Sequence, residues 1–442
     1  MGICVASMIG SGIFLVPGEI GPSLGTPANV LIAWTIGGLL ALCGGFIVAE
    51  IATHKPSAGA VYRTVHDTLG PGAGYLFGTV SVFVGYFASL SVVALTAAGY
   101  ISHFLPAIDV RLLATIVIIV PAVVHGTRVM AGTLLNDVLV ALKLGIIAVF
   151  VVAGLGSNLE TVMPSPDVAP ADAPEPPGPI SASMGAAVVR ISFAYLGWAA
   201  VNVVAGEVRR PGRNLPLAVL GSVALVTIAY LLINIVFMQA VAPAAMVNAA
   251  GEPLSDIGAV AARMIFGEAG GDIVSLAIIA LVVSTAATML FTGSRLLLAM
   301  SWKGELPAPL GRLNAAGAPG RSVLIYAAVG IALLWSVPVG ALLDYAGVLT
   351  TCCAAMMGVA LLVLRRRKSK QPFSMPLYPL PVVVFLGLTT WLLASTVLED
   401  PLVAVASVGT IMIVMLVRPL LTRPVADPSD TYTDEQRKQR RS

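Results

Sequence analysis

Apolar segments of membrane-spanning length recur along almost the whole chain, and this feature limits its possible folds most strongly. A helix needs about 20 mostly apolar residues to cross a bilayer. Twelve segments approach or exceed that length: 1–22, 28–53, 72–103, 110–126, 134–156, 181–207, 216–242, 270–300, 322–338, 341–364, 374–398 and 401–421. Hydrophobic residues make up 57% of the chain and charged residues only 11%, whereas soluble domains carry about 25% charged residues. We therefore expect an all-α, polytopic membrane protein with twelve transmembrane helices.

Lysine and arginine are distributed unevenly among the loops between these segments. Those in short loops fall mostly after even-numbered segments: Lys55, Arg63, Arg128, Arg209, Arg210, Arg213, Lys303, Arg312, Arg321, Arg365, Arg366, Arg367 and Lys368. Loops rich in positive charge face the cytoplasm. The pattern predicts a multi-pass protein of the cell membrane, in contact with the lipid bilayer and with both termini cytoplasmic. A net charge of +3 is too small to indicate a nucleic-acid partner.

Two of the twelve segments contain interruptions. Segment 1 carries Gly10-Ser11-Gly12, and segment 6 carries an aromatic run with Gly197. A break inside the bilayer is tolerated only where the freed backbone groups line a cavity or meet protein, and glycine lets a ligand approach the backbone. The interval of five spans is odd, so a second copy of the first five would enter from the opposite face, which predicts an inverted repeat. Close helix packing is the alternative explanation of the glycines.

Broken helices of this kind suit one class of ligand. The N-terminal end of a half-helix offers unpaired N–H groups and a positive dipole to a carboxylate, while unwound carbonyl groups suit an ammonium or a cation. A zwitterionic amino acid matches both ends at once. The breaks therefore indicate a carrier whose substrate is an amino acid.

The residues at and after the breaks resemble those of the amino acid–polyamine–organocation (APC) superfamily, closest to bacterial L-type amino acid transporter-like exchangers. The matching residues are Gly10 to Phe14 with Pro17, Phe193 to Trp198, Glu207, Pro211, Arg213 to Pro216, Ser294, Arg295, Gly304, Leu306 and Pro307. The resemblance implies a five-plus-five inverted-repeat core, broken in helices 1 and 6, with two accessory helices and alternating access. The corresponding divisions are 1–156 for the first repeat, 157–180 for a Pro-rich extracytoplasmic loop, 181–364 for the second repeat, 374–421 for the accessory helices and 422–442 for a disordered cytoplasmic tail.

The same resemblance implies a substrate site at the two breaks. The N–H groups of Ser11 and Gly12 would bind the substrate carboxylate. Carbonyl groups of Met8, Phe193, Ala194 and Leu196 would bind its ammonium, and Ile9, Gly10, Tyr195 and Gly197 complete the expected site. Phe193 matches the aromatic gate that covers the bound substrate, although an aromatic ring here also suits simple packing.

Lys143 is the most informative charge in the spans. Segment 134–156 starts near the cytoplasm, so nine residues at about 1.5 Å each place Lys143 roughly 13 Å deep. A charge at that depth needs a partner or a function. Lys143 also matches a helix-5 lysine of Na⁺-independent family members, where the ammonium replaces a sodium ion and ties helix 5 to helices 1 and 8. A buried structural ion pair is the alternative.

Other polar residues are open to two interpretations. Arg190 has no counterpart in the family pattern, and it could recognise a side-chain carboxylate or, as we favour, extend outward to Glu19. Ser284 and Thr285 could line the pocket, with a coupling role, or bond to their own helix. Glu50 and Glu207 are expected to form interfacial ion pairs with Lys55 and Arg209. Some antiporters carry a gating glutamate where Ala199 stands here, which weakens acid-activated exchange.

The best-supported function is Na⁺-independent exchange of neutral amino acids by a secondary active transporter, an antiporter. A proton-coupled amino acid or polyamine symporter and, more remotely, a non-transporting membrane sensor are the alternatives. Polyamines are disfavoured because Asp344 is the single acid near mid-depth in spans 1, 3, 6, 8 and 10. No enzyme, cofactor or metal site is indicated. Residues 104–109 contain no cysteine for a disulfide-linked heavy chain.

The residues before Gly10 are few. Nine residues make about 13 Å of helix, less than half of a hydrocarbon core of about 30 Å. The family moves this half-helix as its inner gate, so either the true start lies upstream of Met1, as we favour, or the inner gate of this chain is impaired.

Overall fold

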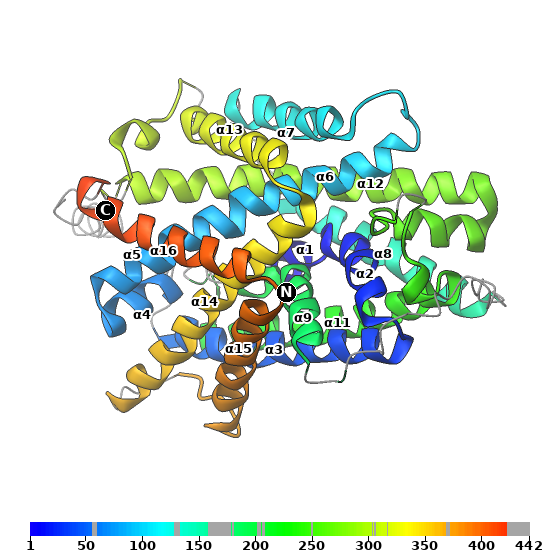
Figure 1. Cartoon of the computed structure of the whole chain (residues 1–442). Coiled ribbons are helices and arrows are strands. Elements are labelled where there is room, and N and C mark those ends of the chain that lie inside the picture. Colours follow the sequence, from blue (N-terminus) through cyan, green and yellow to red (C-terminus); the bar gives the residue numbers. More distant parts are fainter. Residues whose placement is uncertain are drawn as a thin grey trace.

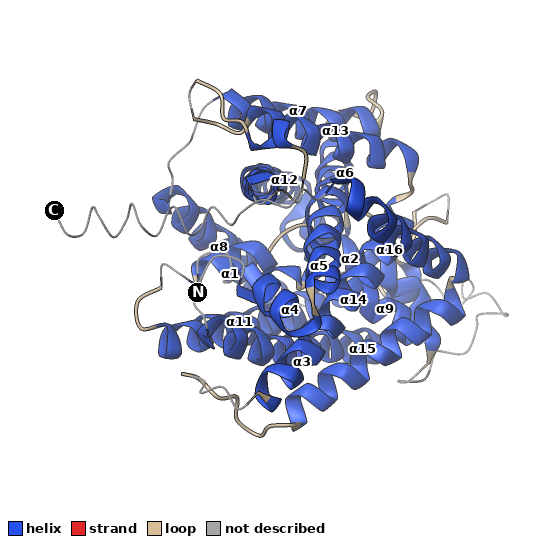
Figure 2. Cartoon of the chain, turned by 90° about the vertical axis from the view of Figure 1, so that its left-hand side faces the viewer, coloured by secondary structure: helices blue, strands red, loops and turns tan. Residues whose placement is uncertain are grey.

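The computed structural model describes the chain in segments. The described residues are 1–54, 60–127, 133–157, 178, 181–200, 205, 208–248, 251–302, 304, 306–315, 317–367 and 372–421. Within them the chain is helical, apart from loops and one isolated bridge between Val247 and Pro253 (Figure 2). The all-α prediction is therefore confirmed. The Pro-rich loop 157–180 and the tail 422–442 lie almost wholly outside the described residues.

The helices follow the predicted segments closely. Their bounds are α1 Gly2–Met8, α2 Gly12–Leu24, α3 Pro27–His54, α4 Ala60–Leu69, α5 Pro71–Val82, the π-helix η1 Phe83–Ala88, α6 Ser89–Ser102, α7 Val110–Thr127, α8 Thr133–Gly156, α9 Ala182–Ala194, the 3-10 helix η3 Leu196–Ala200, α11 Pro211–Ala240, α12 Ile257–Trp302, α13 Gly320–Ser336, α14 Val339–Arg366, α15 Leu380–Glu399 and α16 Pro401–Leu421. Short 3-10 turns η5 Pro243–Ala245 and η6 Ala308–Gly311 lie in loops.

Eight helical stretches among the described residues are long and apolar enough to cross a membrane, and three further apolar helices are shorter. Every predicted segment contains helix, so a multi-pass helical membrane protein is confirmed. The exact count of twelve crossings, like the inverted repeat and the domain divisions, stays a prediction.

The starts of two helices differ most from the prediction. Helix α12 begins at Ile257 rather than near 270, and its backbone departs from helical geometry at Gly267, with φ 72° and ψ 177°. Only glycine adopts that conformation without strain. Helix α15 begins at Leu380 rather than near 374, because Pro379 occupies its N-cap position and a proline cannot continue a helix from the preceding turn.

The interrupted helices lie at the centre of the bundle. In Figure 1 the long helices α3, α11, α6 and α12 run across the view, while the short α1, α2 and α9 lie between them. Their side chains form the core: Ile9, Ile13, Trp34 and Tyr230 are fully buried. The outer helices instead expose apolar side chains, among them Val152, Leu402 and Leu416. This distribution fits a surface that faces lipid.

Candidate functional site

The first helix is broken at the predicted Gly10-Ser11-Gly12 motif. Helix α1 ends at Met8, where Ile9 is extended with φ −76° and ψ 90°, and α2 begins at Gly12 with Ser11 as its N-cap residue. The first N–H groups of a helix have no intrahelical partner. The start of α2 therefore offers backbone donors and the positive end of its dipole to an anion.

The sixth segment is broken directly after Phe193 and Ala194. Helix α9 ends at Ala194, Tyr195 leaves helical geometry with φ −96° and ψ 1°, and the 3-10 helix η3 starts at Leu196. The last carbonyl groups of α9 lack partners further along the same helix. This break therefore offers acceptors, which suit a cation.

The two breaks touch each other through glycines. A Cβ atom at Gly197 would lie 2.2 Å from the Ser7 carbonyl carbon and 2.3 Å from the Met8 nitrogen. A Cβ atom at Gly12 would lie 2.6 Å from the Cα atom of Ala194. These neighbours are backbone or directly attached atoms, which cannot swing aside. Glycine at both positions therefore lets the two interrupted segments cross in backbone contact.

Tyr230 on α11 connects the two breaks, and the sequence interpretation missed it. Its hydroxyl lies 2.6 Å from the Met8 carbonyl oxygen and 3.1 Å from the Ala194 carbonyl oxygen. The single hydroxyl proton serves one acceptor at a time. Both carbonyls were expected to bind the substrate ammonium, and each keeps a second lone pair for that purpose. A tyrosine in the middle of an apolar helix was the one available signal.

Two aromatic rings pack against the Tyr230 ring. The Tyr230 ring lies 5.2 Å from that of Tyr195 and 5.3 Å from that of Trp34, both in edge arrangements. The Trp34 and Tyr195 rings are 6.0 Å apart. Such pairs contribute about 0.5–1.5 kcal/mol beyond area burial. Tyr195 therefore packs into this aromatic group.

Replacing Tyr230 with phenylalanine is expected to reduce the transport rate about tenfold. The ring packing stays, but one buried hydroxyl bond worth about 0.5–1.5 kcal/mol is lost from the point where the two breaks meet. Initial uptake rates in proteoliposomes measure the effect. Tyr326→Phe is the matched control, because Tyr326 is equally buried and donates to the Tyr86 carbonyl away from the breaks. Equal rates for both variants would contradict this role of Tyr230.

Lys143 lies at the first break. Its Nζ atom donates to the Ile9 carbonyl oxygen at 3.2 Å and to the Thr285 hydroxyl at 3.0 Å. The side chain is 6% exposed. Lys143 therefore joins α8 to the break after α1 and to α12, which are the contacts expected of it from the sequence.

Ser284 and Thr285 differ in what they contact. The Ser284 hydroxyl bonds to the Leu281 carbonyl of its own helix at 2.8 Å. The Thr285 hydroxyl also donates to Leu281, at 3.0 Å, and accepts from Lys143. The Thr285 methyl lies 3.3 Å from the position of a Cβ atom on Gly10. Of the two hydroxyls, that of Thr285 belongs to the Lys143 group.

Phe193 lies in the last turn of α9, directly before the break. It is 7% exposed and belongs to an apolar cluster separate from the main core. That cluster, here named the Phe193 cluster, contains Leu15, Val80, Val84, Ala88, Val92, Phe193, Leu342, Leu343, Ala346, Leu349 and Cys353. Its members come from α2, α5, η1, α6, α9 and α14, so Phe193 packs where both half-helices meet α14.

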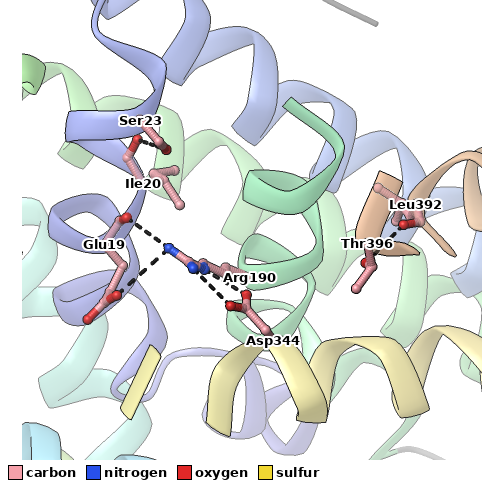
Figure 3. Close-up of polar contacts among 7 residues, drawn as sticks. All are labelled: Glu19, Ile20, Ser23, Arg190, Asp344, Leu392 and Thr396. Carbon is pink, nitrogen blue, oxygen red and sulfur yellow. Dashed lines mark hydrogen bonds and ion pairs between the residues drawn. The ribbon is translucent and has the colours of Figure 1, made fainter. Parts of the chain in front are cut away.

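Arg190 lies one turn before Phe193 on α9 and pairs with the carboxylates of Glu19 and Asp344 (Figure 3). Its Nε and one Nη donate to the two Asp344 oxygens at 2.7 and 2.8 Å. The other Nη donates to the Glu19 carbonyl at 3.1 Å and lies 3.9 Å from the Glu19 carboxylate. The expected Glu19 partner is present, but Asp344 on α14 is the closer one.

Glu50 has a partner that the sequence interpretation did not include. Its carboxylate accepts both N–H groups of Arg365, at 2.6 and 2.7 Å, together with the Met375 backbone N–H. The sequence interpretation paired Glu50 with Lys55 through proximity in the chain and overlooked the far end of α14. Lys55 and Glu207 lie outside the described residues, as does the Ala199 side chain.

Metal-binding clusters are absent from the residues that the structure describes. No group of three His, Cys, Asp or Glu residues there could hold a metal ion. His103 instead bonds Asp272 at 3.2 Å near the surface. The polar groups at the two breaks include the backbone N–H and carbonyl groups, the Lys143 ammonium and the Tyr230 and Thr285 hydroxyls.

Comparisons with known proteins show the family of the chain. The amino acid permease family model matches residues 1–418, and the chain belongs to that family. It is 26% identical over 413 residues to the serine/threonine exchanger SteT of Bacillus subtilis, covering 90% of each chain. It is 28% identical to the human large neutral amino acids transporter small subunit 2, covering 91% of this chain and 75% of that one. It is 26% identical to the mouse b(0,+)-type amino acid transporter 1, covering 90% and 82%.

Proposed function

We propose that this protein exchanges neutral amino acids across the cell membrane by alternating access and without sodium. The observation that carries the proposal is the contact of the Lys143 ammonium with Ile9 and Thr285. An ammonium is a fixed monovalent cation that binds to the carbonyl and hydroxyl oxygens of a broken helix. Because the Lys143 ammonium occupies that place, no sodium ion is needed to hold α1, α8 and α12 together.

The substrate class follows from the two breaks. The α2 N-terminus suits the substrate carboxylate and the free lone pairs at Met8 and Ala194 suit its ammonium, so the backbone recognises the part common to all amino acids. A charged substrate side chain would need a free opposite charge. Arg190 is already engaged by Asp344 and Glu19, which favours neutral substrates. The names of the exchangers to which the chain is similar support the same class.

The orientation is also part of the proposal. The excess of Lys and Arg after even-numbered segments supports cytoplasmic termini. The end of α2 at Leu24 and the start of α14 at Val339 then face outward.

Uptake of labelled serine and leucine into proteoliposomes tests exchange. We expect uptake to rise at least about tenfold when the vesicles contain unlabelled amino acid. The reason is that an exchanger changes from its inward-open to its outward-open state most readily with substrate bound. A pH gradient imposed on empty vesicles forms the second arm. Uptake driven by the pH gradient, and not by internal amino acid, would contradict exchange and indicate proton coupling.

A further inference from the structure

We propose that Arg190, Asp344 and Glu19 form a latch that holds the extracytoplasmic side closed, and that Arg190 passes from Asp344 to Glu19 when this side opens. The inference rests on the proposed function for its orientation and its transport cycle. The latch joins the two half-helices, α2 and α9, to α14 at the outer end of the Phe193 cluster (Figure 3).

The contacts form a barrier with two layers. Arg190 precedes Phe193 by one turn on α9, and Asp344 lies beside Leu342 and Leu343 of the Phe193 cluster. The apolar layer excludes water from the breaks, and the ionic layer above it fixes α9 to α14 by a bidentate bond. Outward access to the breaks requires that both half-helices separate from α14.

The second carboxylate gives Arg190 a partner in the open state. The Asp344 carboxylate accepts from Nε and one Nη of Arg190 at 2.7 and 2.8 Å. The Glu19 carboxylate lies 3.9 Å from the other Nη, and its side chain is only 7% exposed. A guanidinium left unpaired at this depth would be costly. Helix α9 packs against both α2 and α14. In the proposed opening α9 stays with α2, so Glu19 remains near Arg190 when α14 separates. The transfer from one carboxylate to the other keeps the guanidinium paired throughout.

The opposite end of α14 lacks such an exchange. Glu50 is fully buried and takes Arg365 in a bidentate bond together with a backbone N–H, while Arg365 also stacks on Tyr378 at 3.8 Å. One guanidinium meets one carboxylate there. The geometry suits a permanent anchor of α14 to α3, whereas two carboxylates around one guanidinium suit a switch.

Two isosteric substitutions separate the roles. Asp344→Asn removes the partner of Arg190 in the closed state, so the population of the open state rises. Glu19→Gln removes the partner of Arg190 in the open state, so the population of the closed state rises. Cys353 of the Phe193 cluster serves as the reporter after Cys4, Cys43 and Cys352 are changed to Ala. A membrane-impermeant methanethiosulfonate, added outside, labels Cys353 when the cluster opens.

We expect Asp344→Asn to raise the labelling rate about tenfold and Glu19→Gln to lower it about threefold or more, since bonds to charged groups are strong. The charge exchange Arg190→Asp with Asp344→Arg is expected to return labelling toward the parent rate. Ser183→Ala, which removes an α9 hydroxyl bond to Glu399, should leave it unchanged.

Shifts in the same direction for both amide variants would overturn the transfer, and unchanged labelling in both would overturn the latch. Because labelling requires no substrate, these outcomes are independent of transport. Opposite shifts in a protein that fails to carry amino acids would support the latch and refute the proposed function instead.

Discussion

Replacing Lys143 with methionine is expected to reduce amino acid uptake by at least about 100-fold. Methionine has a similar length but no charge, so Ile9 and Thr285 lose a cationic donor. Hydrogen bonds to charged groups contribute about 1.5–3 kcal/mol each, and about 1.4 kcal/mol is a factor of ten. Initial exchange rates at saturating internal substrate measure the loss.

Two hydroxyl variants separate the Lys143 contact from general effects on α12. Thr285→Val keeps the side-chain shape and removes one Lys143 contact, so an intermediate loss of about tenfold is expected. Ser284→Ala removes a hydroxyl that bonds only its own helix among the described contacts, and it should change uptake less than twofold. If Lys143→Met transports as well as the parent protein, the ammonium has no role in the site.

Replacing Gly197 with alanine is expected to abolish transport and to lower the stability of the protein. The added Cβ atom would lie 2.2–2.3 Å from the Ser7–Met8 peptide, so the two breaks must separate. Overpacking of this kind costs about 1–3 kcal/mol, sometimes more. Uptake and the midpoint of thermal unfolding in detergent give the two readouts.

A glycine without such a neighbour provides the control. Gly387 on α15 has open space around the position of a Cβ atom, and alanine there suits a helix better than glycine. Gly387→Ala should leave uptake unchanged and unfold at the same temperature or higher. Full activity of Gly197→Ala would show that the two breaks do not need backbone contact.

The fold and the position of the breaks could be predicted from local features. The length of the apolar segments identified the spans. Gly10-Ser11-Gly12 indicated a break because two glycines inside a membrane span favour an interrupted helix. Lys143 was informative because a charge is rare at its depth. Each of these signals is contained in one short stretch of sequence.

Contacts between distant helices could not be predicted in the same way. Tyr230 meets two carbonyl groups 222 and 36 residues away, and a hydroxyl on an apolar helix gives no sign of which backbone it faces. Arg190 was assigned Glu19, but the bidentate partner is Asp344 on α14. Ion pairs across a bundle depend on helix rotation and tilt, which residue spacing alone leaves open.

Sodium dependence tests the central claim most directly. Proteoliposomes loaded with unlabelled amino acid are assayed for labelled uptake in sodium chloride and in choline chloride at equal ionic strength. The Lys143 ammonium already supplies the cation at the first break, so equal initial rates are expected in the two salts. Uptake that requires sodium, and disappears in choline, would contradict the account.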